Sequence, residues 1–145
     1  MKMVLLIIMV LMMSMISGWH TNFMRAKEEA RSEHKYVLLN FSGSDWCVPC
    51  IRTKAEIFDA KQFSAFADSN LVLVNADFPR LKKNKLTMMQ TKENEALAEK
   101  YNKKGTFPLT ILLDPDGKVL KEWVGYPGID PHQFIEQIKS VEKRD

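Results

Sequence analysis

Residues 46–50, Trp46-Cys47-Val48-Pro49-Cys50, contain the only two cysteines of the 145-residue chain. The run before them, 36–41, is β-branched, aromatic and almost free of charge, which predicts a buried strand. After them, the segment 51–58 carries apolar residues at helical spacing, with one face formed by Ile51, Ala55 and Phe58. The cysteine pair is therefore expected on a turn that leaves a strand and begins a helix.

The start of a helix is a favourable place for a reactive cysteine. A helix N-terminus carries unpaired N–H groups and about half a positive charge, which favours a thiolate over a thiol. We expect Cys47, at the mouth of the turn, to be the exposed nucleophile. Cys50, one turn further on, is expected to be the buried partner that attacks a mixed disulfide. Pro49 fits the first turn because its missing N–H has no partner there.

The Trp-Cys-x-x-Cys motif between a hydrophobic strand and a helix resembles the thioredoxin superfamily. Its lead-in, 41–46, is similar to the bacterial envelope thioredoxin-like branch, and the resemblance extends from about Tyr36 to about Tyr126. It implies an α/β thioredoxin fold, a four-stranded mixed sheet with helices on both faces, here with an added N-terminal helix. It also implies that substrates bind around the motif, at Trp46, Val48 and Pro49.

A second motif, Thr106-Phe107-Pro108, precedes a strand-like run at 109–113. Thioredoxin-like folds have a cis-proline at this point, facing the active disulfide, and Pro108 matches it by order and context. A proline at the start of a central strand is unusual on physical grounds too, and a cis bond is one way to accommodate it. The resemblance implies that the Phe107 backbone pairs with an extended substrate, placing its cysteine over Cys47. An ordinary trans loop proline is the alternative.

One position departs from the family pattern. Many thioredoxins have a buried Asp on the strand before the motif, which takes the proton from the second cysteine. The matching residue here is Asn40, if one extra residue is allowed in 42–44. Asparagine cannot ionise, so the proton must go to water or to another group. Asp45, beside the motif, is read as a solvated or capping residue in preference to an acid catalyst.

The rest of the chain predicts alternating helices and strands. We expect an amphipathic helix from Trp19 to about Lys35, a short helix at 60–67, a central parallel strand at 71–77, and a helix from Thr91, its N-cap, to about Lys103. A turn at 114–117 joins two strands, and Asp130 caps a last helix with Gln133 completing a capping box.

The connection at 78–90 is long and rich in basic residues. It is read either as a solvated loop or, less favoured, as a docking surface for a partner. In the second reading its Leu86, Met88 and Met89 form an adaptable contact.

The amino-terminal segment, 1–18, has a basic start followed by an apolar run that only Ser14 interrupts. This pattern is typical of a secretory signal peptide, and the run is short for a membrane span, which needs about 20 residues. An uncleaved membrane anchor is the alternative. We expect a single domain at 19–145 in a periplasmic or otherwise extracytoplasmic location, an oxidising environment.

Composition narrows the function classes. The net charge of +3, from 21 basic and 18 acidic residues, is too balanced to favour nucleic acid or an acidic substrate. Two cysteines cannot form a disulfide-rich framework, and no second Cys or His pair completes a zinc site. The three histidines, His20, His34 and His132, are scattered and are expected to be solvated. No metal and no cofactor is expected.

The favoured hypothesis is an exported thiol–disulfide oxidoreductase that reduces protein disulfides through a Cys47/Cys50 dithiol–disulfide cycle. Its partners would be protein thiols and disulfides and an upstream electron-donor protein, with membrane contact only through an uncleaved N-terminus. The alternative is a binding module of the same fold, with a static Cys47–Cys50 disulfide and a peptide groove near Phe107 and Pro108. Metal handling by the two thiolates is disfavoured because no third ligand lies close in sequence.

Overall fold

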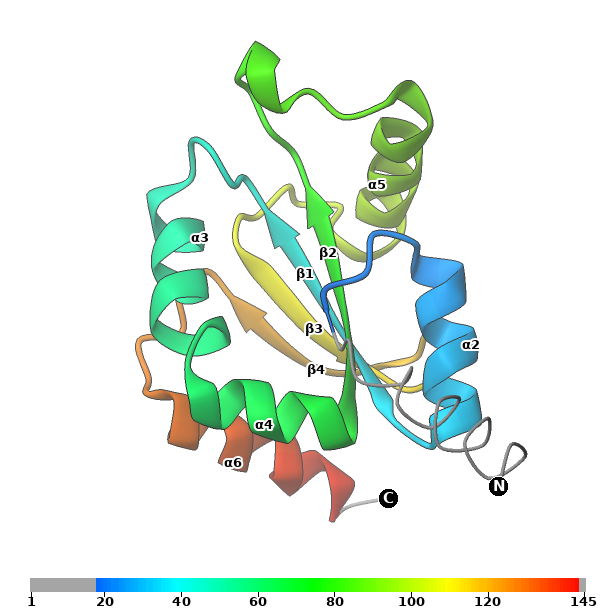
Figure 1. The fold of residues 1–145 in the computed structure, drawn as a ribbon, viewed down its shortest axis with the longest axis vertical. Coiled ribbons are helices and arrows are strands. Elements are labelled where there is room, and N and C mark those ends of the chain that lie inside the picture. Colours follow the sequence, from blue (N-terminus) through cyan, green and yellow to red (C-terminus); the bar gives the residue numbers. More distant parts are fainter. Residues whose placement is uncertain (1–17, 144–145) are drawn as a thin grey trace, which may run out of the picture.

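A computed structural model of the chain describes residues 18–143. The segment expected to be a leader or an anchor, 1–18, lies outside the described residues except for Gly18. In chain order the elements are α2 (Phe23–Glu33), β1 (Tyr36–Ser42), α3 (Val48–Thr53), the π-helix η2 (Lys54–Phe58), α4 (Lys61–Asn70), β2 (Leu71–Asp77), the 3-10 turn η3 (Lys82–Asn84), α5 (Met88–Tyr101), β3 (Leu109–Leu113), β4 (Val119–Val124) and α6 (Pro131–Glu142), as Figure 1 shows.

The four strands form one mixed sheet in the order β2-β1-β3-β4. β1 pairs parallel with β2 and antiparallel with β3, and β3 pairs antiparallel with β4. Phe41, near the end of β1, lies opposite Ala76 near the end of β2 and Leu109 at the start of β3. The cysteine motif, the loop after β2 and the segment before β3 therefore meet at one edge of the sheet. The predicted thioredoxin fold is confirmed.

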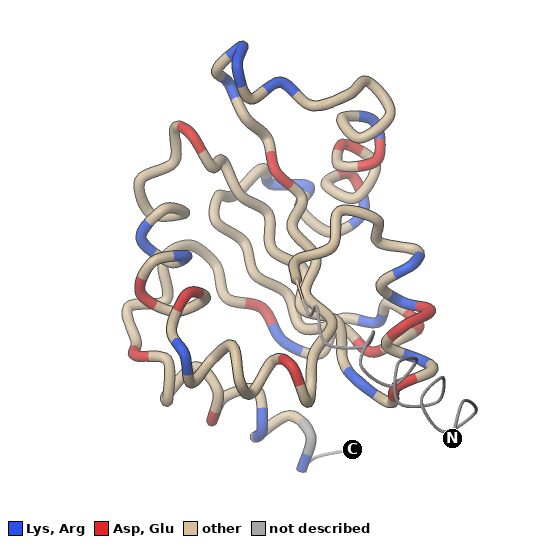
Figure 2. Tube along the Cα trace, viewed as in Figure 1, with Lys and Arg blue, Asp and Glu red and all other residues tan. Residues whose placement is uncertain are grey.

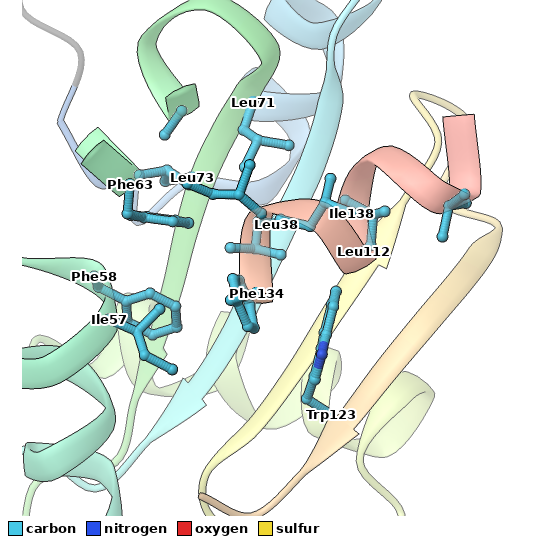
Figure 3. Packing of buried hydrophobic residues seen from close by; sticks show 13 residues of the cluster. Leu38, Ile57, Phe58, Phe63, Leu71, Leu73, Leu112, Trp123, Phe134 and Ile138 are labelled. Carbon is cyan, nitrogen blue, oxygen red and sulfur yellow. The ribbon is translucent and has the colours of Figure 1, made fainter. Parts of the chain in front are cut away.

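Alternation along β1 supplies both hydrophobic cores. Val37, Leu39 and Phe41 pack on one face, under α2 and α5, and Leu38 packs on the other face, under α4 and α6. Figure 3 shows this second core, in which Phe134 lies close to Leu38 and to Trp123. Successive strand residues point to opposite faces, so a strand buried on both sides reads as a continuous apolar run.

The first helix begins later than predicted. Asn22 caps it, accepting a hydrogen bond from the Arg25 N–H at 3.0 Å, so the helix starts at Phe23. The residues before it are extended: the His20 N–H donates to the Leu73 carbonyl, and its carbonyl accepts from the Asn75 N–H. Trp19 therefore packs against Phe58 on the opposite face of the sheet, not on the helical stripe of Ala26 and Ala30.

The helix after the motif buries a different face from the one predicted. Ile51 and Ala55 are exposed, and the buried residues are Cys50, Thr53, Ile57 and Phe58. The inward direction is set by Cys50, whose sulfur meets Cys47 and the Gly43 N–H, so Ile51 is rotated outward. The prediction failed because it took the first apolar residue, and not the second cysteine, as the start of the inward stripe.

The helix predicted from Thr91 begins one turn earlier, at Met88. Thr87 is its N-cap and accepts a hydrogen bond from the Gln90 N–H at 3.1 Å. The Thr91 hydroxyl instead donates back to the Thr87 carbonyl inside the helix. Met88 and Met89 thus belong to the first helical turn and not to the preceding loop.

Two local predictions from turn chemistry are confirmed. The Gly117 N–H donates to the Asp114 carbonyl in the turn between β3 and β4, with Gly117 at a φ of 88°. Asp130 and Gln133 form the expected reciprocal capping box at the start of α6. Within residues 18–143, no helix is both long and apolar enough to span a membrane.

Candidate active site

Cys47 and Cys50 form a disulfide at the junction of β1 and α3, with their Cα atoms 5.2 Å apart. Cys47 is the N-cap of α3, and its sulfur accepts the backbone N–H of Cys50 at 3.3 Å. The Cys50 sulfur lies 3.5 Å from the backbone nitrogen of Gly43, which donates to it. Each sulfur therefore has one backbone donor, an arrangement that favours negative charge on sulfur when the disulfide opens.

Both cysteines are buried in this oxidised state, each only 4% exposed. The expectation of an exposed Cys47 beside a buried Cys50 is therefore not met here. The accessible part of the motif is its middle, since Val48 is 73% exposed and Pro49 is also exposed.

Trp46 is fixed on several sides. Its indole N–H donates to the Phe78 carbonyl at 2.7 Å, and its ring lies 5.5 Å from the ring of Phe107. The Arg80 guanidinium carbon stands 3.7 Å from the ring centroid, which is a close cation–π contact. Gly43 leaves room for the ring, because a Cβ at that position would lie 2.3 Å from Trp46 Cε2. Trp46 therefore links the motif to the loop after β2 and to the segment before β3.

The peptide bond between Phe107 and Pro108 is cis, as predicted. Pro108 is buried, and its carbonyl accepts the Gly125 N–H at 2.8 Å, which ties the segment before β3 to the end of β4. Phe107 packs between the rings of Trp46 and Phe78. The two predicted motifs are thus brought together at one end of the sheet.

Asn40 lies beside the second cysteine. It is 7% exposed, and it lines a hollow of about 300 Å³ together with Cys50, Ser42 and Asn75. Its side-chain amide donates to Asn75 Oδ1 at 3.1 Å, and its oxygen accepts the Thr110 hydroxyl at 3.0 Å. The position where many thioredoxins have a buried Asp therefore carries a neutral, hydrogen-bonded side chain.

Asp45 holds the loop after β2 against the motif. Its carboxylate accepts the backbone N–H groups of Arg80 and Leu81 at 2.9 and 3.0 Å, and the side-chain amide of Asn84 at 3.0 Å. The Arg80 hydrogen bond is the main cause that lowers the pKa of Asp45 from its ordinary value. Asp45 thus caps backbone N–H groups, which fits the expected capping role. The groups that it caps lie 35 residues further along the chain, in the loop after β2.

Comparison with known proteins decides the family. The profile of the family described as "Thioredoxin-like domain" matches residues 23–142. The chain belongs to the thioredoxin-like family. The "Disulfide bond reductase DsbH" of Chlamydia pneumoniae is 33% identical to it over 122 residues, covering 84% of this chain and 71% of that protein.

Solved structures agree with this membership. The structure titled "DsbH Oxidoreductase" matches this thioredoxin-like chain with a TM-score of 0.78 and 32% identity, covering 87% of this chain and 84% of that one. A thioredoxin from Thermus thermophilus matches with a TM-score of 0.62 and 16% identity, covering 87% and 88% of the two chains. The second likeness shows the shared fold alone.

This thioredoxin-like chain has a further cluster near the motif, formed by Arg52, Glu56 and Tyr126, which the sequence did not predict. The Tyr126 hydroxyl donates a hydrogen bond to Glu56 Oε2, and the other carboxylate oxygen accepts Arg52 Nε at 2.7 Å. The Arg52 guanidinium also lies 4.3 Å from the centroid of the Tyr126 ring. The hydrogen bond from Tyr126 is the main cause that lowers the pKa of Glu56, and the same bond raises the pKa of Tyr126. This cluster ties the helix after the motif to the segment after β4.

The sequence could have predicted only one contact of that cluster, the ion pair between Arg52 and Glu56. Arg52 and Glu56 stand four residues apart, the spacing of an ion pair on a helix. Nothing local indicates Tyr126, which is brought in by the fold from 70 residues away.

Proposed function

We propose that this chain is an exported thiol–disulfide oxidoreductase that reduces disulfides in proteins. The observation that carries the reaction class is the Cys47–Cys50 disulfide at the start of α3, where each sulfur receives a backbone N–H. Membership in the thioredoxin-like family and the likeness to a disulfide bond reductase support the same class.

The cycle begins with both cysteines reduced. The Cys47 thiolate, stabilised by the Cys50 N–H, attacks one sulfur of a substrate disulfide. A Cys47–substrate disulfide forms, and the other substrate sulfur leaves as a thiolate. Val48 and Pro49, the exposed middle of the motif, are the surface that meets the substrate, together with Trp46, Phe107 and Pro108.

Cys50 completes the transfer. It loses its proton and attacks the Cys47 sulfur, so the Cys47–Cys50 disulfide forms and the second substrate thiolate is released. The substrate gains two electrons and the chain loses two, which leaves the oxidised state described above. Asn40, its hydrogen-bond partners Asn75 and Thr110, and the neighbouring Ser42 are all neutral. Lys54 also lines the hollow, but it is paired with Asp59 as a cation and cannot accept a proton, so we assign the proton to water.

The direction and the location complete the proposal. The reductive direction is supported by the likeness to the disulfide bond reductase DsbH of Chlamydia pneumoniae. Each turnover then needs an external dithiol, in an electron-donor protein, to reduce Cys47–Cys50 again. Export rests on the signal-peptide pattern of residues 1–18.

The reduction potential of Cys47–Cys50 tests the direction. The domain 19–145 is equilibrated in dithiothreitol and glutathione redox buffers, and the oxidised fraction is read from tryptophan fluorescence or thiol alkylation. A potential near about −270 mV, at the thioredoxin end of the range, supports a reductase. A potential near about −120 mV means that the chain donates its disulfide to other proteins, and overturns the reductive direction.

A binding module with a static disulfide is the second candidate. The observation that favours it is the burial of both cysteines, each 4% exposed. This reading predicts that excess dithiothreitol leaves the disulfide of the native chain intact. Rapid and reversible reduction of the folded chain excludes it.

A further inference from the structure

The loop after β2 forms a concentrated basic surface. We define the basic segment as residues 78–86, whose cations are Arg80, Lys82, Lys83 and Lys85, all exposed. No ion pair involves any of these four within residues 18–143, whereas Arg31, Arg52 and Lys54 are paired. Figure 2 shows the blue positions gathered at the end of the molecule where Figure 1 places the loop between β2 and α5.

The basic segment is attached to the cysteine motif at several points. Asp45 binds the backbone N–H groups of Arg80 and Leu81, and Trp46 binds the Phe78 carbonyl. The Arg80 guanidinium lies on the Trp46 ring, directly beside Cys47 in the chain. A protein whose disulfide reaches Cys47 would therefore lie next to this segment. The surface is formed before any partner arrives, which lowers the entropic cost of docking.

Nearby carboxylates leave the segment positive. Asp45 and Asp77 are each engaged in hydrogen bonds, Asp77 with the backbone N–H and the hydroxyl of Ser44. Glu95 is the remaining acid beside the segment, in the lining of a hollow of about 370 Å³. Lys82 and Lys85 line the same hollow. Asp45 and Asp77 keep their negative charge when hydrogen-bonded, so the four exposed cations stand against three carboxylates and the segment keeps a small net positive charge.

Exposed apolar side chains accompany the charges. Leu81 is 48% exposed, and Met88 and Met89, in the first turn of α5, are 75% and 73% exposed. Methionine side chains are flexible and adapt to different contacts. The combination of unpaired cations with adaptable apolar groups is suited to a protein segment that mixes acidic and apolar residues.

We propose that the basic segment is a docking surface for acidic protein segments that flank the disulfide reduced by Cys47. This inference rests on the proposed function, because it names the class of substrate for the same site. Complementary charge mainly raises the rate of encounter, by roughly tenfold or more at low salt. The effect decreases as salt shortens the Debye length, to about 3 Å at 1 M.

Matched peptides provide the test. Three disulfide-linked peptide dimers have the same length and the same cysteine position, with flanks of Glu, Gln or Lys. The reduced domain 19–145 is mixed with each dimer, and the rate of disulfide transfer is followed at low and high salt. We expect the Glu dimer to react roughly tenfold faster than the Gln dimer at low salt and the Lys dimer to react more slowly. At 1 M salt we expect the three rates to converge.

Two charge variants locate the effect. K82Q/K83Q/K85Q removes three cations of the basic segment and leaves Arg80 on Trp46. K61Q/K118Q/K143Q removes three other exposed cations, from α4, from the turn before β4 and from the end of α6. We expect the ratio of Glu to Gln rates to fall to about one in the first variant and to persist in the second. Circular dichroism and thermal melting check that both variants are folded.

The outcomes separate this inference from the proposed function. If the unmodified domain reduces all three dimers at equal rates, or if both variants lose selectivity equally, the docking surface is wrong and the reductase stands. If it reduces none of them, the proposed function fails. An anionic membrane is the competing occupant. If vesicles with phosphatidylserine sediment the domain through Lys82, Lys83 and Lys85 while the peptides show no selectivity, the segment is a lipid-binding surface and the inference is overturned.

Discussion

The side-chain amide of Asn40 donates to the side-chain oxygen of Asn75 at 3.1 Å, on two neighbouring parallel strands. The Thr110 hydroxyl completes this network from β3, at 3.0 Å from the Asn40 oxygen. The network lies beside the hollow that Cys50 also lines, and none of its three side chains ionises in the range where thiols titrate. In the proposed cycle, Cys50 would therefore release its proton without help from a carboxylate in this network.

Asn40→Asp tests how strongly the buried position of Asn40 disfavours a charged carboxylate. At 7% exposure the introduced carboxyl should have its pKa raised by burial, above the usual value of about 3.9. The unfolded chain then loses this proton at lower pH than the folded chain. The variant should therefore lose stability relative to the unmodified chain as pH rises from about 4 through the raised pKa, and then level off. Urea unfolding across this pH range measures the difference.

Asn75→Asp is the matched control for Asn40→Asp. Asn75 belongs to the same hydrogen bond but is only half-buried. Burial should therefore raise the pKa of its introduced carboxyl less, and the loss of stability should be smaller and complete at lower pH. Equal profiles for the two variants would show that the hollow beside Cys50 does not distinguish the two positions.

The two cysteines should differ in what their removal does. Cys47→Ser should abolish disulfide reduction, because the attacking thiolate is lost. Cys50→Ser should keep the attack but block release, so a disulfide between Cys47 and the substrate should accumulate. Mass spectrometry of non-reduced samples measures this adduct. An adduct that forms in Cys47→Ser and not in Cys50→Ser would reverse the assigned roles.

The Asp45 carboxylate should titrate below the ordinary aspartate value of 3.8, because the folded state holds it ionised with backbone donors. A depressed pKa gives stability that is present above the unfolded value and is lost as pH falls through the folded value. The amide proton shifts of Arg80 and Leu81 should report that low midpoint in NMR titrations. Asp45→Asn should remove the transition, whereas Asp116→Asn, on the distant turn, should leave it in place. A midpoint at or above 3.8 would contradict the anchoring role.

Local sequence patterns predicted the parts of the fold whose cause is local. The apolar run at 71–77 and the capping chemistry of Asp130 correspond directly to β2 and to the start of α6. The predicted helix boundaries were wrong where a tertiary contact competes with the local preference of the sequence. Trp19 continues the helical stripe in sequence, but strand-like pairing of His20 with β2 draws it to the other face of the sheet.

The same distinction between local and tertiary causes applies to the candidate active site. Cys47, Cys50 and cis-Pro108 were predictable because each has a motif of its own in the chain. Asp45 is predicted to be a solvated or capping residue, but no sequence pattern points to its partners 35 or more residues away. The stacking of Arg80 on Trp46 likewise exists only because the ends of β1 and β2 are neighbours in the sheet.

Tyr126→Phe should raise the pKa of Glu56 above its lowered value. The Tyr126 hydroxyl is the main cause of that lowering, so its removal should let the pKa of Glu56 rise toward 4.5. Arg52 remains and should keep part of the shift. NMR titration of the Glu56 side-chain carboxyl carbon measures the change. Tyr101→Phe, which removes a hydroxyl bound to the Gly117 carbonyl, is the control that should leave Glu56 unaffected.

Gly43→Ala should disturb the site through Trp46. The added Cβ would lie 2.3 Å from Cε2 and 2.5 Å from Cζ2 of the indole, so the ring must move. Overpacking of a buried position typically costs about 1–3 kcal/mol. The displaced ring would also lose its hydrogen bond to the Phe78 carbonyl and its contact with Arg80. We therefore expect lower stability in urea unfolding and slower disulfide transfer.

A double-mutant cycle isolates the cause of that loss. In Trp46→Phe the smaller ring lacks the part of the indole that the new methyl group would strike, so Gly43→Ala should cost much less stability in that background. The interaction free energy between the two substitutions should then be of the size expected for residues in contact, about 0.5–3 kcal/mol. If Gly43→Ala lowers the free energy of unfolding equally in both backgrounds, Gly43 is required for the backbone conformation before Cys47 and not for the packing of Trp46. The cycle thus decides whether the ring that links the motif to the basic segment is positioned by that glycine.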